Sequence, residues 1–259
     1  MFSLGIFIVL MIQLFDTQLI ILLCIPSFLI GLSRGGLGGG FGLAAAIFTA
    51  QLMEPISAAA FLLPILVASD PLSIFIYRNY IYWKSLIVLI PGAIIGIITT
   101  YFLINVISNS VIGLIVGFLA ISLVFENLIS KYINYKRVKY NPIIGLFLGS
   151  LGGFSSFIIH SGLPPIAAYL LPFKLSRQSF MGTVAITFGI INFIKILPYL
   201  MLDLFDEKLI NTALFLIPVS YLGIFIGKII NNKISDKVFY FIIYSTIFLL
   251  GLRLILISF

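Results

Sequence analysis

Two interruptions of a very apolar sequence carry residue types that could bind an anion. The first, residues 31–42, holds seven glycines together with Arg34. Glycine lacks a Cβ and adopts positive φ readily, so this stretch should break a helix and expose backbone N–H groups, unless the small residues serve instead as a tight helix contact. We predict one wall of a binding site here, formed by Arg34, Gly36, Gly38, Gly39 and Gly40.

The second interruption is the run His160-Ser161-Gly162-Leu163-Pro164-Pro165. Proline lacks an N–H donor and suits the first turn of a helix, so a short helix should begin at Leu163. The partial positive charge at its start would favour an anion. His160 could donate to that anion, relay a proton or cap the helix. We predict the second wall to consist of His160, Ser161, Gly162 and Pro164.

Polar residues also interrupt the apolar run that follows each break. Asp70 lies about two-thirds along one run, and Asn192, Lys195 and Tyr199 share one helix face in the other. A carboxylate within a membrane helix indicates function, through proton coupling or an ion pair with Lys195 or Arg34. We assign Asp70 to coupling, and Asn192 and Lys195 to substrate binding. A structural ion pair, and snorkelling of either cation to the membrane surface, are the alternatives.

The composition requires a membrane protein. The chain has 259 residues, of which 61% are hydrophobic and 9% charged, and its mean hydropathy is +1.24. Apolar runs of about 20 residues, each able to cross about 30 Å of hydrocarbon as a helix, recur throughout. The net charge of +7 comes from short loops, which predicts membrane orientation rather than nucleic-acid binding.

We predict an all-α protein of two inverted repeats, residues 1–130 and 142–259, joined by a basic cytoplasmic linker, residues 131–141. Each repeat has about five segments, giving eight full transmembrane helices and two short interrupted ones. The expected segments are 19–32, 42–52, 57–77, 85–104 and 110–129, then 142–158, 163–173, 178–199, 209–229 and 238–257.

Weak internal similarity and loop charge predict the inversion. A shift of 122 residues aligns Asp70 with Asn192 and Tyr77 with Tyr199, and a shift of 127 aligns Gly96 with Gly223. The loop 78–84 is basic and its counterpart 201–208 is acidic, so the two should face opposite sides of the membrane. Residues 1–15 have no basic start or cleavage site and are expected to be retained, with both termini in the periplasm.

Metal, disulfide and cofactor chemistry are not indicated by a single His and a single Cys24. An intramembrane serine protease would need a nucleophile and a base on neighbouring helices, which the adjacent His160 and Ser161 do not supply. We therefore expect no enzyme and no cofactor.

The chain resembles the sulfite exporter TauE/SafE family, also called the toluene-sulfonate uptake permease group. The resemblance rests on the glycine-rich loop 31–42, on Leu63-Pro64 through Asp70 to Tyr77-Arg78, and on the run from His160 through Pro172 to Asn192, Lys195 and Tyr199. It implies ion-coupled transport of sulfite, sulfonates or sulfoacetate. Many relatives have Ala and Gly where this chain has Ser161 and Leu163.

We expect a transporter of small, sulfur-containing anions that works by alternating access, in a bacterial inner membrane. Its expected partners are the lipid bilayer, the anionic substrate and a coupling proton or sodium ion, without nucleic acid, and a homodimer is an open arrangement. An anion channel and a carboxylate transporter are the alternatives.

Overall fold

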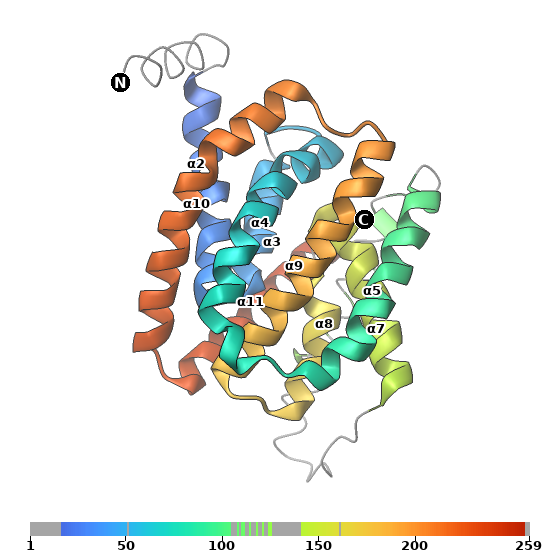
Figure 1. Cartoon of the computed structure of the whole chain (residues 1–259), viewed down its shortest axis with the longest axis vertical. Helices are drawn as coiled ribbons and strands as arrows, with labels where there is room; N and C mark the ends of the chain where they lie inside the picture. Colours follow the sequence, from blue (N-terminus) through green and yellow to red (C-terminus); the bar gives the residue numbers. More distant parts are fainter. Residues whose placement is uncertain are drawn as a thin grey trace.

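The computed structural model describes residues 17–50, 52–104, 141–160 and 162–256, together with isolated positions between 108 and 125. Every regular element in these residues is a helix (Figure 1). The elements are α2 (Thr17–Leu32), the π-helical turn η1 (Ser33–Leu37), α3 (Gly39–Thr49), α4 (Pro55–Tyr77), η2 (Arg78–Tyr80), α5 (Trp83–Leu103), α7 (Pro142–Ile159), α8 (Leu163–Leu170), η3 (Leu171–Phe173), α9 (Arg177–Met201), α10 (Glu207–Lys233) and α11 (Asp236–Leu256).

The predicted class is confirmed, because five of the described helical stretches are long and apolar enough to cross a membrane. They are Gln18–Leu37, Ile56–Tyr80, Trp83–Leu103, Arg177–Met201 and Glu207–Lys233. Thirteen of the twenty positions of the expected segment 110–129 lie outside the described residues, as do the linker 131–141 except Asn141 and the segment 1–15. The predicted total of eight full spans therefore stays a prediction.

The second segment of each half is short, as expected. Helix α3 has 11 residues and α8 has eight. At a rise of 1.5 Å per residue these helices are about 16 and 12 Å long, against roughly 30 Å of hydrocarbon. Neither helix can cross the membrane alone, so both must be held inside the protein.

Two helix pairs flank a central pair. Helix α2 packs on α10, and α5 packs on α7, while α4 and α9 contact one another between them (Figure 1). The outer pairs approach so closely that backbone touches backbone. A Cβ on Gly31 would overlap the carbonyl oxygen of Ser220, and a Cβ on Gly153 would overlap that of Ala93. The glycine-rich segment therefore makes a tight helix contact as well as a helix break.

The loops of opposite charge lie at opposite ends of the bundle. The loop after α4, which contains Arg78, is at the lower end of Figure 1, and the loop after α9, which contains Asp203 and Asp206, is at the upper end. Asp206 also caps α10, because its carboxylate accepts a hydrogen bond from the backbone N–H of Leu209 at 3.0 Å.

Candidate functional site

The first helix break is confirmed at the glycine-rich segment. Helix α2 continues into η1, where Gly36 has φ 124°, and Gly38, with φ 91°, precedes the start of α3. These φ values lie in the region that side chains with a Cβ disfavour. A Cβ on Gly36 would in addition overlap the hydroxyl of Tyr77. The chain therefore reverses its helical path here because glycine occupies these positions.

The second break is confirmed after α7. His160 adopts a left-handed conformation, with φ 50°, and α8 begins at Leu163 as expected. Pro164 and Pro165 lie in the first turn, where a missing N–H costs no helical hydrogen bond. Ser161 lies outside the described residues, so its predicted role stays a prediction.

Asp70 joins the two halves at the centre of the protein. Its Oδ1 lies 2.7 Å from Nε of Arg34, and its Oδ2 accepts a hydrogen bond of 2.7 Å from Nδ2 of Asn192. The side chains come from α4, η1 and α9, and all three residues are buried. Of the two ion pairs left open by the sequence, the one with Arg34 is formed.

The guanidinium of Arg34 has unused hydrogen-bond donors. Among the residues that the structure describes, it meets only the carboxylate of Asp70 and the ring of Phe188, whose centroid is 5.4 Å from Cζ. The N–H of Nε does not point at the carboxylate within hydrogen-bond geometry, so the contact with Asp70 is a charge pair. Arg34 is only 8% exposed, which excludes snorkelling. A buried guanidinium with unfilled donors is suited to an oxyanion.

Lys195, in contrast, is fully coordinated by the protein. Its Nζ donates to the carbonyl oxygen of Ser156 at 2.9 Å and to Oγ of Ser156 at 3.2 Å, and it lies 2.9 Å from Nδ1 of His160. These three contacts equal the three donors of an ammonium group. Nδ1 of His160 then accepts, and its Nε2–H donates to the carbonyl oxygen of Ala59 at 2.9 Å. Lys195 is 0% exposed, so it does not snorkel.

A cavity of about 30 Å³ lies between the two breaks. Its walls include Gly42 in the first turn of α3 and Leu163 at the start of α8. The other lining residues are Ile30, Ser33, Arg34, Leu62, Leu66, Ser156, His160, Phe188 and Asn192. This volume is about that of one water molecule in the liquid. A polyatomic anion would therefore require the walls to separate.

The predicted site residues lie at different distances from this cavity. Arg34, His160 and Asn192 line it directly, and Asp70 and Lys195 contact these lining residues. The remaining predicted residues with a described environment are buried around the breaks without lining the cavity, namely Gly36, Gly38, Gly162 and Pro164. Gly39 and Gly40 form the first turn of α3.

Eight of the eleven lining residues were not predicted as site residues from the sequence, although helical spacing could have found two of them, Ser156 and Phe188. Ser156 precedes His160 by four residues, and Phe188 precedes Asn192 by four, so each lies on the same helix face as a predicted residue. Ser33, another of these eight, adjoins Arg34 in η1. No comparable signal distinguishes it from other serines in membrane helices.

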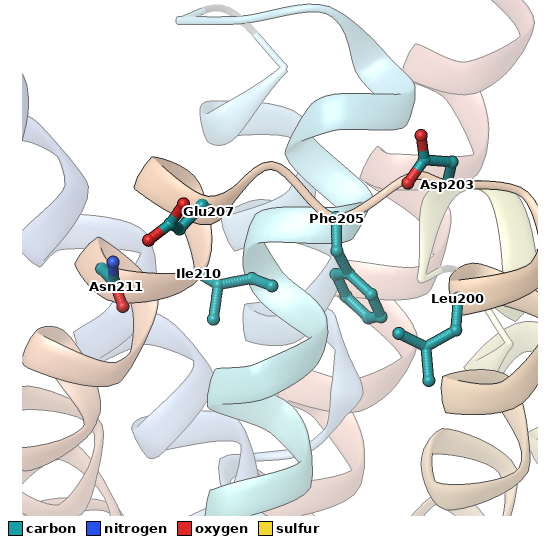
Figure 2. Close-up of a pocket in the computed structure, with 6 residues that line it drawn as sticks. All are labelled: Leu200, Asp203, Phe205, Glu207, Ile210 and Asn211. Atoms are coloured by element: carbon teal, nitrogen blue, oxygen red, sulfur yellow. The ribbon is translucent and has the colours of Figure 1, made fainter.

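A larger depression of about 290 Å³ opens at the end of the bundle where α9 leads into α10. Leu200, Phe205 and Ile210 form its apolar part, and Asp203 and Glu207 stand at its edge, with carboxylates that point in different directions (Figure 2). The acids therefore do not converge on one point. Within the part of the chain that the structure describes, no three His, Cys, Asp or Glu side chains are grouped to hold a metal.

Comparison with known proteins gives one match. The family model described as "Sulfite exporter TauE/SafE" matches residues 23–254, which is nearly the whole chain and contains both breaks, α4 and α9. No curated protein and no solved structure matches the chain. The chain belongs to the sulfite exporter TauE/SafE family of membrane transporters.

Proposed function

We propose that this protein transports a small sulfur-containing oxyanion, such as sulfite or a short sulfonate, which binds between the two helix breaks. The observation that carries the proposal is the buried side chain of Arg34, which lines the cavity and whose guanidinium donors are not satisfied by the described residues. Guanidinium offers paired N–H donors that match the geometry of oxyanions.

The charge of the site supports an anion. If Lys195 is an ammonium, which the three acceptors around its Nζ fit, Arg34 and Lys195 contribute two positive charges and Asp70 contributes one negative charge, while the hydrogen bonds of His160 are those of a neutral ring. The cluster therefore has a net charge of about +1 in a low-dielectric surrounding. The first turns of α3 and α8 add partial positive charge at the cavity wall.

The packing supports the proposal that the two halves are inverted repeats. Gly31 of α2 fits against Ser220 of α10, and Gly153 of α7 fits against Ala93 of α5. Gly31 and Gly153 are 122 positions apart, and their partners Ala93 and Ser220 are 127 positions apart. These are the same two shifts that align the halves in sequence. Exchanging the halves thus exchanges one helix pair with the other, as an inverted repeat requires.

The distribution of charge supports an orientation in the bacterial cytoplasmic membrane. The end of the bundle that carries Arg78 also carries Arg177, whose guanidinium donates to the carbonyl oxygen of Ile234. The opposite end carries Asp203 and Asp206. Since short basic loops stay in the cytoplasm, the end with Arg78 would face inward.

Coupling would follow from competition for Arg34. An anion that binds this guanidinium weakens its attraction for Asp70, and a buried carboxylate without its cation favours protonation. The other polar groups near this carboxylate are Asn192 and Lys195 of α9, and His160 lines the same cavity. Anion and proton would therefore bind together and cross together. Alternating access would open the cavity to each side of the membrane in turn.

Purified protein in liposomes tests this function. Uptake of radiolabelled sulfite should saturate and respond to an imposed pH gradient, and Asp70→Asn should remove the response to the gradient while Glu54→Gln, at an exposed acid before α4, should keep it. Uptake of acetate or succinate in place of sulfite and methanesulfonate would shift the assignment to carboxylates. A non-saturating ionic conductance would indicate a channel. If pH dependence persists in Asp70→Asn, Asp70 is not the coupling residue.

A further inference from the structure

The carbonyl groups at both helix breaks are held by side chains of the following long helix. At the first break, Oγ of Ser73 donates to the carbonyl oxygen of Arg34 at 2.8 Å, and the hydroxyl of Tyr77 donates to that of Gly35 at 2.7 Å. Where a helix is interrupted, such carbonyls lose intrahelical partners. In a membrane they must find others, because the hydrocarbon offers none. Helix α4 supplies them.

The second break repeats this arrangement residue by residue. Nζ of Lys195 donates to the carbonyl oxygen of Ser156, and the hydroxyl of Tyr199 donates to that of Phe157. Each of these four positions lies 122 residues after its counterpart at the first break. The same shift relates Asp70 to Asn192, which bond to each other between the two arrangements.

Two side-chain hydrogen bonds to the backbone are therefore equivalent in the two halves. The donor residue differs between the halves in the first bond and is the same in the second. Serine occupies the first donor position in α4 and lysine occupies it in α9, whereas tyrosine occupies the second in both. Both tyrosines are buried, at 4% and 0% exposure. Since tyrosine hydroxyls at these positions meet backbone at a break rather than solvent, their common role is to fix the break.

We propose that Tyr77 and Tyr199 are matched positioning residues, each of which holds the interrupted helix of its own half and thereby places Arg34 or Ser156 at the cavity wall. The transport test of this role rests on the proposed function, whereas the hydrogen bonds and the exchange test do not. Neither hydroxyl lines the cavity, so both would act through the residues that do.

Asn231 connects a third element, α10, to the hydrogen bonds at the first break. Its Nδ2 donates to the hydroxyl of Tyr77 at 2.9 Å, and that hydroxyl donates its own hydrogen to Gly35. Tyr77 therefore ties η1 and α4 to α10. Among the described residues no equivalent donor contacts the hydroxyl of Tyr199, so the first break should be the more firmly held.

Amide hydrogen exchange tests the proposal without any substrate. Tyr77→Phe should accelerate exchange in residues 33–42 by about three- to tenfold, the factor expected for one lost hydrogen bond, and should leave residues 156–166 unchanged. Tyr199→Phe should do the reverse. Tyr221→Phe is the matched control, because Tyr221 also donates to a backbone carbonyl, at 3.1 Å, but the acceptor is Ala68 within α4 rather than a residue at a break.

Transport provides the second readout. For sulfite, Tyr77→Phe and Tyr199→Phe should each raise KM by about three- to tenfold with a smaller change in maximal rate, because each loosens a residue that lines the proposed anion site. Ser73→Ala tests the first break with a smaller change in side chain. Exchange that stays at wild-type rates in both tyrosine variants, or that rises equally at both breaks, overturns the proposal. If the wild-type protein fails to transport sulfite while exchange changes as stated, the proposed function fails and the positioning role stands.

Discussion

The pair of Arg34 and Asp70 allows a quantitative test, because each residue can be neutralised with little change in shape. Asp70→Asn leaves an oxygen that can still accept from Asn192 and removes only the charge. Arg34, 8% exposed, then keeps a positive charge without its partner. Arg34→Gln has the converse effect on Asp70, which is 2% exposed.

The expected magnitude follows from the distance and burial of the pair. Unit charges about 4 Å apart attract by about 4 kcal/mol at an effective dielectric constant near 20. Breaking a buried pair by removing one partner typically costs about 3–5 kcal/mol. For a chain of this size each kcal/mol corresponds to roughly 2–4 °C. Each single variant should therefore melt about 10 °C below the wild-type protein.

The double variant decides between a true pair and two independent residues. Arg34→Gln combined with Asp70→Asn leaves no unpaired charge, so it should melt above either single variant. The assay is the apparent melting temperature in detergent at one fixed heating rate, with Glu54→Gln as the exposed-acid control, for which no change is expected. A double variant whose loss equals the sum of the single losses would refute the pairing.

Two further perturbations concern the second half and the glycine contacts. Lys195→Met removes the three donors that bind Ser156 and His160, so it should lower the melting temperature and reduce sulfite uptake at least tenfold. Normal uptake would show that these bonds are dispensable for transport. Gly31→Ala should lower the melting temperature by several degrees, because its Cβ would overlap the Ser220 carbonyl oxygen. In Gly42→Ala the Cβ would lie 3.3 Å from its nearest neighbouring atom, so this variant should melt normally. Because Gly42 lines the cavity, the variant should nevertheless impair uptake. Equal melting temperatures for the two glycine variants would contradict the packing.

The places of both breaks could be predicted from local sequence. Positive φ at Gly36 and Gly38 follows from the absence of a Cβ, and the start of α8 at Leu163 follows from prolines in its first turn. Membrane residence follows from composition alone. The equivalence of Asp70 and Asn192 was also indicated by the shift of 122 residues, but their contact with each other is known only from the structure.

The partners of the buried charges depended on the tertiary structure. In the sequence Asp70 could pair with Lys195 or with Arg34, and both choices satisfy the same chemistry. Helix α9 directs Lys195 toward Ser156 and His160, which uses its three donors, and η1 brings Arg34 to Asp70. These contacts join residues far apart in the chain, so their distances depend on how closely α2 approaches α10 and α4 approaches α9.

The sequence by itself determined the membrane class, the two breaks and the charged residues available to a site, because each depends on composition or on backbone preferences within a few residues. Only the tertiary structure decided that Arg34 has donors left over by the described residues, whereas the three donors of Lys195 all have partners. The same structure decided that Tyr77 and Tyr199 reach equivalent carbonyls. The physical reason is that hydrogen-bond satisfaction belongs to the packed bundle, where each donor meets the acceptors that neighbouring helices place within about 3 Å.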